Sequence, residues 1–240
     1  GCLYAMGGVA EPFTVMSALL LLSLLPLLLF WQPGSSSSPE KTEVRAGPSK
    51  WAILMKPGFL TVFLSQVMLM VTWGAFDLNF TTWLHETFGF TTLVAGLYFA
   101  IGPAGYMATA MPCGWLIDRT GRGKLLLAVG FFGQAMAFGA FFPPLAIGPL
   151  GVAAMMALNG LMAPPCIVPA LPDMLGYLED ESEDLINWAS GLLVTAQALG
   201  ATLGPLLGAA AADRVGFGWM LTGVALLDTA VAVLLLLADG

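Results

Sequence analysis

Charged residues are scarce in this chain of 240 residues: they make up 10% of it, whereas 58% of the residues are hydrophobic. A soluble domain carries about 25% charged residues, so this composition excludes an ordinary soluble protein and indicates an integral membrane protein. The eight lysines and arginines form no basic face, which excludes nucleic acid as a partner.

Histidine and cysteine are also rare. The single histidine, His85, excludes a metal cluster built from histidines. The three cysteines, Cys2, Cys113 and Cys166, lie in or beside apolar stretches at unrelated spacings, which argues against a disulfide framework and against a metal site. We also find no nucleophile–base pair and no phosphate-binding loop in the sequence. The chain is therefore predicted to be no enzyme and to need no cofactor.

Long apolar runs, in contrast, are abundant. A helix needs about 20 mostly apolar residues to cross a bilayer. By this criterion we predict an all-α integral membrane protein with about seven transmembrane helices. The predicted spans are residues 12–31, 58–83, 91–112, 124–142, 148–177, 187–210 and 216–237.

The only long polar stretch is WQPGSSSSPEKTEVRAGPSK at residues 31–50, whose serine, proline and glycine content predicts a flexible linker. Basic residues concentrate in two loops on one side of the predicted spans, and the only one on the opposite side is Arg214. Because basic loops stay in the cytoplasm, we predict that the linker and the third loop are cytoplasmic. The basic residues of these two loops are Lys41, Arg45, Lys50, Lys56, Arg119, Arg122 and Lys124.

The third loop is the sequence GWLIDRTGRGK at residues 114–124. Its glycines permit a tight turn and a close approach of two helices, and its aspartate can accept hydrogen bonds at the start of the next helix. Without reference to any family, it predicts a basic hinge between two helices. The residues that carry the pattern are Gly114, Asp118, Arg119, Gly121 and Arg122.

This loop resembles the motif G-x-L-x-D-R-x-G-R-x-K of the major facilitator superfamily, which joins helices 2 and 3 there and, in a second copy, helices 8 and 9. The linker is similar to the connection between the two six-helix halves of that fold. The resemblance implies that the seven spans are helices 6 to 12 of twelve. Residues 1–31 would then hold the end of helix 5 and helix 6, residues 32–57 the cytoplasmic linker, and residues 58–240 the C-terminal six-helix bundle. The chain is expected to be a fragment, whose partner is the missing N-terminal half.

Apart from Lys124, the loop residue at which one predicted span begins, the charged side chains inside the predicted spans are all carboxylates. They are Asp77, Asp173 near the cytoplasmic end of its span, and Asp228; the uncharged Gln197 lies midway along another span. Ionisable residues inside a membrane are functional candidates. A carrier with embedded carboxylates and no embedded cation suits a cation, a proton or both.

The segment GAFDLNFTTWLHET at 74–87 resembles helix 7 of the vesicular amine transporters, and the resemblance places Asp77 on their required glutamate. Monoamine and acetylcholine carriers have aspartates where this chain has Val168 and Val194. The segment PALPDMLGYL at 169–178 is more similar to the polyamine-type branch. What that branch implies is exchange of luminal protons for a cytosolic organic cation such as a polyamine.

The resemblance makes Asp77 the leading candidate for substrate binding and proton coupling, and helical spacing adds that Trp73, Asp77 and Thr81 share one helix face. Each polar candidate also has a purely structural interpretation. Asp77 could be a buried acid whose oxygens accept hydrogen bonds from neighbouring side chains, and Asp173 could be an acid at a helix end that faces cytoplasmic water. Gln197 could form a hydrogen bond to another helix. For Asp228 the structural role is favoured. The predicted substrate and coupling residues are Asp77, Gln197, Asp173, Trp73 and Asn79, and the predicted packing and gating residues are Gly200, Gly204 and Pro205.

The function predicted from these features is proton-coupled antiport of a polyamine or amine across a vesicle membrane or the plasma membrane. Two alternatives stay open: a drug-efflux or other metabolite carrier of the same superfamily, and a half-carrier that transports nothing. The expected partners are the lipid bilayer, protons, a small organic cation and the N-terminal half.

Overall fold

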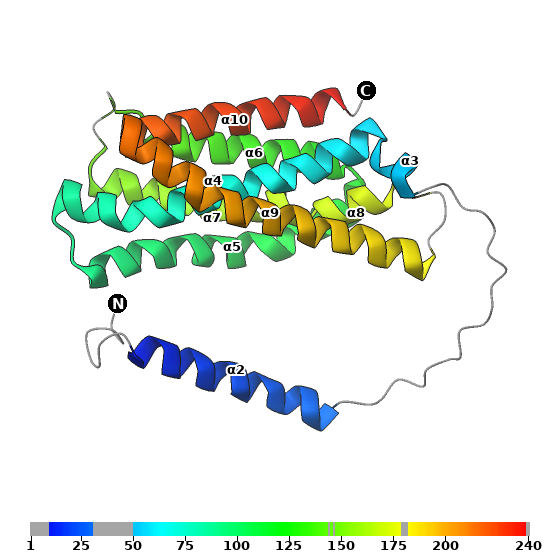
Figure 1. The fold of residues 1–240 in the computed structure, drawn as a ribbon, viewed down its shortest axis with the longest axis horizontal. Helices are drawn as coiled ribbons and strands as arrows, with labels where there is room; N and C mark the ends of the chain where they lie inside the picture. The colour runs from blue at the N-terminus through cyan, green and yellow to red at the C-terminus, as the bar shows by residue number, and fades with distance from the viewer. Residues whose placement is uncertain (1–9, 31–49, 144, 146, 179–181, 239–240) are drawn as a thin grey trace.

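The computed structural model describes residues 10–30, 50–143, 145, 147–178 and 182–238 of the chain, and every regular element in these residues is an α-helix. This confirms the prediction of an all-α protein. The helices are α2 (Ala10–Phe30), α3 (Lys50–Leu54), α4 (Pro57–Phe88), α5 (Thr92–Thr120), α6 (Gly123–Gly139), α7 (Pro149–Ile167), α8 (Ala170–Leu175), α9 (Glu183–Val215) and α10 (Phe217–Leu237), as Figure 1 shows.

Five stretches of the described chain are long and apolar enough to cross a membrane: α4, α5, the stretch Pro149–Leu175 formed by α7 and α8, α9 and α10. Shorter apolar helices cover Phe13–Ser23, within the predicted span 12–31, and Gly123–Gly139, which begins one residue before the predicted span 124–142. Helix α6 ends at Gly139, three residues before the end of that predicted span.

Several helices extend beyond the spans predicted from hydropathy. The predicted spans end at residues 83 and 112, yet α4 continues through the polar His85 and Glu86 to Phe88, and α5 continues past Asp118 to Thr120. Each helix ends where a glycine takes a left-handed conformation, with φ of 66° at Gly89 and 61° at Gly121. Backbone hydrogen bonding therefore sets the helix ends, and these do not coincide with the end of the apolar stretch.

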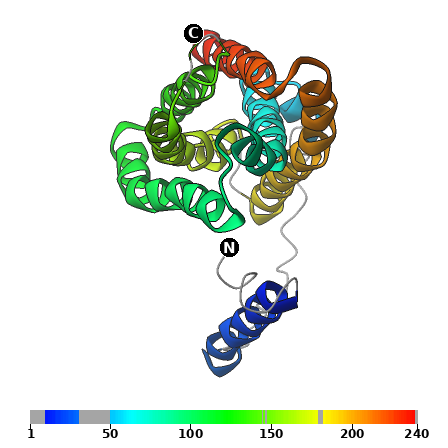
Figure 2. The same ribbon diagram turned by 90° about the vertical axis from the view of Figure 1, so that its left-hand side faces the viewer.

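Helices α4 to α10 form one bundle, whereas α2 lies apart from it in both views (Figures 1 and 2). Helix α4 packs most extensively on α9, α6 packs on α10 and α7, and α5 packs chiefly on α7. The predicted linker 32–57 includes α3, whose Ile53 is fully buried in the core of the bundle. Residues 32–49 of that linker lie outside the described residues.

The contact between α4 and α9 is a contact of backbone with backbone. Gly200, Gly204 and Gly208 are buried along one face of α9. A Cβ atom added at Gly200 would meet the carbonyl oxygen of Val67, and one at Gly204 would lie 2.6 Å from the carbonyl oxygen of Val71. Small residues at this spacing let two membrane helices approach closely.

Pro205 lies in the same contact, where its Cδ atom is 2.7 Å from the position of a Cβ added at Gly74 of α4. The three predicted packing residues, Gly200, Gly204 and Pro205, therefore all face α4.

Candidate functional site

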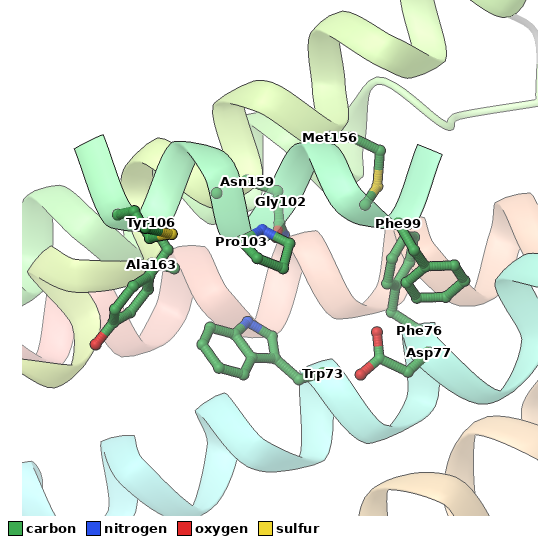
Figure 3. Close-up of a pocket in the computed structure, with 12 residues that line it drawn as sticks. Trp73, Phe76, Asp77, Phe99, Gly102, Pro103, Tyr106, Met156, Asn159 and Ala163 are labelled. Carbon is green, nitrogen blue, oxygen red and sulfur yellow. The ribbon is translucent and has the colours of Figure 1, made fainter. Parts of the chain in front are cut away.

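A cavity of about 350 Å³ opens between α4, α5 and α7. Figure 3 shows it in close-up. Aromatic and other apolar side chains form most of its wall. The twelve residues that line it are Trp73, Phe76, Asp77, Phe99, Gly102, Pro103, Tyr106, Met107, Met156, Asn159, Gly160 and Ala163.

Helix α4 supplies the carboxylate of the cavity. Trp73 and Asp77 are one helical turn apart, and Phe76 lies between them, so all three reach the same side of α4. In Figure 3 the indole of Trp73 and the carboxylate of Asp77 both point from α4 toward α5. The Asp77 side chain is exposed, as a side chain that lines an open cavity can be. The structure thus brings together two of the predicted site residues, Trp73 and Asp77.

The opposite wall depends on a close approach of α5 to α7. A Cβ atom at Gly160 of α7 would meet the carbonyl oxygen of Gly102 of α5, so only glycine permits this contact. The Thr109 hydroxyl of α5 also donates to the carbonyl oxygen of Leu161 of α7 at 3.0 Å. These contacts hold α5 and α7 together as one wall of the cavity.

Asn159 is the polar group of the α7 wall, and Gln134 of α6 holds it in place. The Nδ2 of Asn159 donates to the Oε1 of Gln134 at 2.7 Å, and the Nε2 of Gln134 donates to the carbonyl oxygen of Asn159 at 3.1 Å. Gln134 is fully buried.

The indole nitrogen of Trp73 is buried and has no hydrogen-bond partner among the described residues. A buried donor without a partner costs about 1–3 kcal/mol. In Figure 3 this nitrogen faces the stretch of α5 that contains Gly102 and Pro103.

Asn79 and Gln197, two other predicted site residues, do not line this cavity. The side chain of Asn79 donates to the carbonyl oxygen of Ala75, one turn back on α4, at 2.9 Å. Gln197 donates to the Oε1 of the fully buried Gln66 at 3.4 Å, and Gln66 donates to the carbonyl oxygen of Cys166 at 2.8 Å. Gln197 therefore makes an interhelical hydrogen bond between α9 and α4.

Asp173 lines a different cavity, of about 400 Å³, beside the turn between α5 and α6. Its Oδ1 atom lies 3.0 Å from the position of a Cβ added at Gly123, the first residue of α6. A carboxylate at the start of a helix is stabilised by the helix dipole. Beside it, the Lys124 amine lies 5.1 Å from the centre of the Tyr177 ring and donates to the carbonyl oxygen of Ala238 at 2.8 Å.

Of the five predicted residues of the loop motif, Gly121 lines this second cavity and the other four do not. Gly114, seven residues earlier on α5, has open space where a Cβ would be. Asp118 and Arg122 are exposed, and the Arg119 guanidinium stacks 4.6 Å from the centre of the Trp115 ring. In this structure the motif thus makes a helix turn with a basic outer surface.

Asp228 is fully buried between α10 and α4, where its Oδ1 accepts a hydrogen bond of 3.1 Å from the Thr72 hydroxyl. Its Oδ2 is buried and has no hydrogen-bond partner among the described residues.

Sequence reasoning selected Trp73 and Asp77 and missed the other ten of the twelve lining residues, among them Phe99, Tyr106, Met156 and Asn159. A polar residue in an apolar span is a signal, and Asn159 could have been selected by it. The aromatic and methionine residues carry no such signal, because each one by itself is typical of any membrane helix.

Comparison with known proteins agrees with this architecture. The family model described as Major Facilitator Superfamily matches residues 1–178. The protein named MFS-type transporter SLC18B1 is similar over 91% of this chain: the Mus musculus protein is 26% identical over 235 residues, and the Homo sapiens protein is 24% identical over 233 residues. The chain spans about half the length of these relatives, 49% and 48% respectively. With its long apolar helices, this chain is a multi-pass membrane protein that belongs to the major facilitator superfamily.

Proposed function

We propose that the chain is the C-terminal half, together with helix 6, of a secondary active transporter that exchanges protons for an organic cation. The observation that carries this proposal is the placement of the Asp77 carboxylate in a cavity walled by aromatic rings. The names of the similar proteins, which call them transporters, support transport as the general activity.

The cavity offers an organic cation two kinds of attraction. The carboxylate of Asp77 pairs with an ammonium group, and the faces of Trp73, Phe76 and Phe99 attract a cation through their ring quadrupoles. Such contacts are worth about 0.5–2 kcal/mol each, more where water is excluded. The apolar wall accommodates the hydrocarbon part of the substrate.

Exchange follows from competition for one carboxylate. A proton that binds Asp77 removes the negative charge that attracts the ammonium group, and a bound ammonium group disfavours protonation. If the cavity opens alternately to the two sides of the membrane, each side can release one ion and bind the other. Alternating access in this fold involves both six-helix halves, so the proposal assigns the second wall of the cavity to the N-terminal half.

A carrier of lipophilic cations is the second candidate, favoured by the apolar lining that Met107 and Met156 add to the rings. Polyamines carry several charges, whereas this half supplies one carboxylate among the described lining residues. Under the polyamine proposal, further carboxylates come from the other half.

The test is uptake into acidified proteoliposomes that contain the full-length carrier. We expect Asp77→Asn to abolish proton-driven uptake and Asp77→Glu to retain part of it. Asp213→Asn is the matched control, because Asp213 is an exposed acid near the end of α9 and does not line the cavity. Uptake that survives in Asp77→Asn at the wild-type rate contradicts the proposal. Labelled polyamines, monoamines and lipophilic dyes compared in this assay separate the two candidate functions, and the 240-residue chain alone should transport none of them.

A further inference from the structure

Asp228 lies at the middle of α10, where it is the only charged residue of an apolar helix that runs from Phe217 to Leu237. An ionised side chain is most costly at the centre of a membrane-spanning helix. The side chain of Asp228 is also fully buried within the bundle, so no solvent reaches it. Its depth in the helix and its burial therefore both disfavour the ionised carboxylate.

The two oxygens of Asp228 have different surroundings. Oδ1 accepts a hydrogen bond of 3.1 Å from the hydroxyl of Thr72, whereas Oδ2 is buried and receives no hydrogen bond from the described residues. An ionised carboxylate shares its charge between two oxygens and needs donors at both. A neutral carboxylic acid fits the asymmetry better. Its carbonyl oxygen, here Oδ1, accepts a hydrogen bond, and the oxygen that carries the proton, here Oδ2, needs no donor.

No cation among the described residues compensates a negative charge at Asp228, because burial and the Thr72 hydroxyl are the influences that the structure places on it. Lys124 of α6 does approach α10, but it donates to the carbonyl oxygen of Ala238, ten residues or about 15 Å further along the helix. The buried Cys166 thiol of α7 interacts electrostatically with Asp228, and a thiol supplies no positive charge. The other titratable residues on α4 and α9, which pack on α10, are exposed: Asp77, His85, Glu86, Glu183, Asp184, Asp213 and Arg214.

We propose that Asp228 is a proton-binding site, whose carboxyl group carries a proton on Oδ2 while α10 is packed on α4. The proton comes from water, and it returns to water when the contact opens. Because the closed contact favours the protonated acid, proton binding favours the closed contact to the same extent. Asp228 does not line the cavity of Asp77, so this site is separate from the proposed exchange site and does not depend on it.

The first test is denaturant unfolding of the full-length carrier in detergent micelles at a series of pH values, for the wild type and for Asp228→Asn. Asparagine resembles the protonated acid but cannot ionise. An aspartic acid in water loses its proton near about pH 4, so the unfolded wild type releases a proton that the folded protein keeps. Rising pH therefore favours unfolding of the wild type. Its unfolding constant, divided by that of Asp228→Asn, should increase about tenfold per pH unit above about pH 5, as long as the folded carboxyl keeps its proton.

The matched control is Asp213→Asn, which neutralises an exposed acid near the end of α9. This variant should show the same dependence of its unfolding constant on pH as the wild type.

The second test is infrared spectroscopy of the folded carrier at neutral pH. A protonated carboxyl group has a carbonyl stretching band that a carboxylate lacks. The band of Asp228 should be lost in Asp228→Asn and kept in Asp213→Asn. Thr72→Val retains the acid but removes the hydroxyl that donates to Oδ1, so it should shift the same band to higher frequency. This variant decides the question if Asp228→Asn does not fold.

Either measurement can overturn the proposal. If Asp228 is ionised in the folded protein, the ratio of the unfolding constants stays constant or decreases as the pH rises. The proposal is also wrong if no carbonyl band of a protonated acid responds to substitution of Asp228 or Thr72. Neither test uses a transported substrate. The proposed function can therefore fail in the uptake assay while this inference holds, and the reverse is equally possible.

Discussion

Asp77 and Asp228 are two aspartates beside the same helix, and they occupy opposite environments. Asp228 reaches α4 from α10, is fully buried and accepts a hydrogen bond from Thr72. Asp77, five residues after Thr72 on α4, is exposed and lines the cavity opposite α5. One acid thus accepts a hydrogen bond across a helix contact, and the other lines an open cavity. Both residues are aspartates in apolar spans, so residue type alone cannot separate these roles. The difference comes from what each side chain faces: Thr72 of α4 for Asp228, and an open cavity for Asp77.

The two sides of α4 differ in packing as well. Toward α9 the helix meets a row of glycines at backbone contact, and toward α5 and α7 it leaves a cavity of about 350 Å³. Close packing against α9 holds α4 in position, which fixes the side chains that α4 contributes to the cavity. The open side leaves room for a ligand. The following predictions test this difference between the two sides.

The largest effect is expected on the closely packed side. Gly204→Ala places a Cβ atom 2.6 Å from the carbonyl oxygen of Val71, so α4 and α9 must separate. We expect a loss of about 3 kcal/mol or more in the free energy of unfolding, measured by thermal or denaturant unfolding in detergent micelles. Gly191→Ala on the same helix is the control, because a Cβ there has open space around it, and it should stabilise by up to about 1 kcal/mol. Equal effects of the two substitutions would show that the glycine contact does not hold α4.

A smaller effect should separate the two aspartates. Asp228→Ala leaves the Thr72 hydroxyl without its acceptor in the core, and we expect it to destabilise the fold by about 2–3 kcal/mol. Asp77→Ala removes an exposed side chain and should change the free energy of unfolding by less than about 0.5 kcal/mol. The same micelle assay measures both variants. The proposed division of roles is wrong if Asp77→Ala proves the more damaging of the two.

The smallest effect concerns Trp73 on the open side. Trp73→Phe removes a buried N–H that has no partner among the described residues, while most of the ring remains. We expect the stability of the protein without substrate to stay constant or to rise by up to about 1 kcal/mol. A loss greater than about 1 kcal/mol in the melting experiment would mean that the indole nitrogen is hydrogen-bonded in the membrane.

Much of the architecture could be predicted from local patterns. Apolar runs located the helices, and the GWLIDRTGRGK turn between α5 and α6 indicated the family that the comparison then confirmed. The helix ends were less accurate, since α4 and α5 continue past their apolar stretches until Gly89 and Gly121. Trp73 and Asp77 could be placed on one face from helical spacing alone. Gln197 could not be distinguished from a cavity residue, because its partner Gln66 lies on another helix.

The sequence by itself determined that this is a multi-pass helical membrane protein and which face of α4 bears Asp77, since composition and helical period are properties of neighbouring residues. Only the tertiary structure decided which polar groups meet across helices. Asp77 faces α5, Asp228 bonds to Thr72, and Gln134 orients Asn159. The physical reason is that each span is apolar on nearly all its faces. Hydropathy therefore does not specify which face meets which neighbour, and close packing and interhelical hydrogen bonds make that choice.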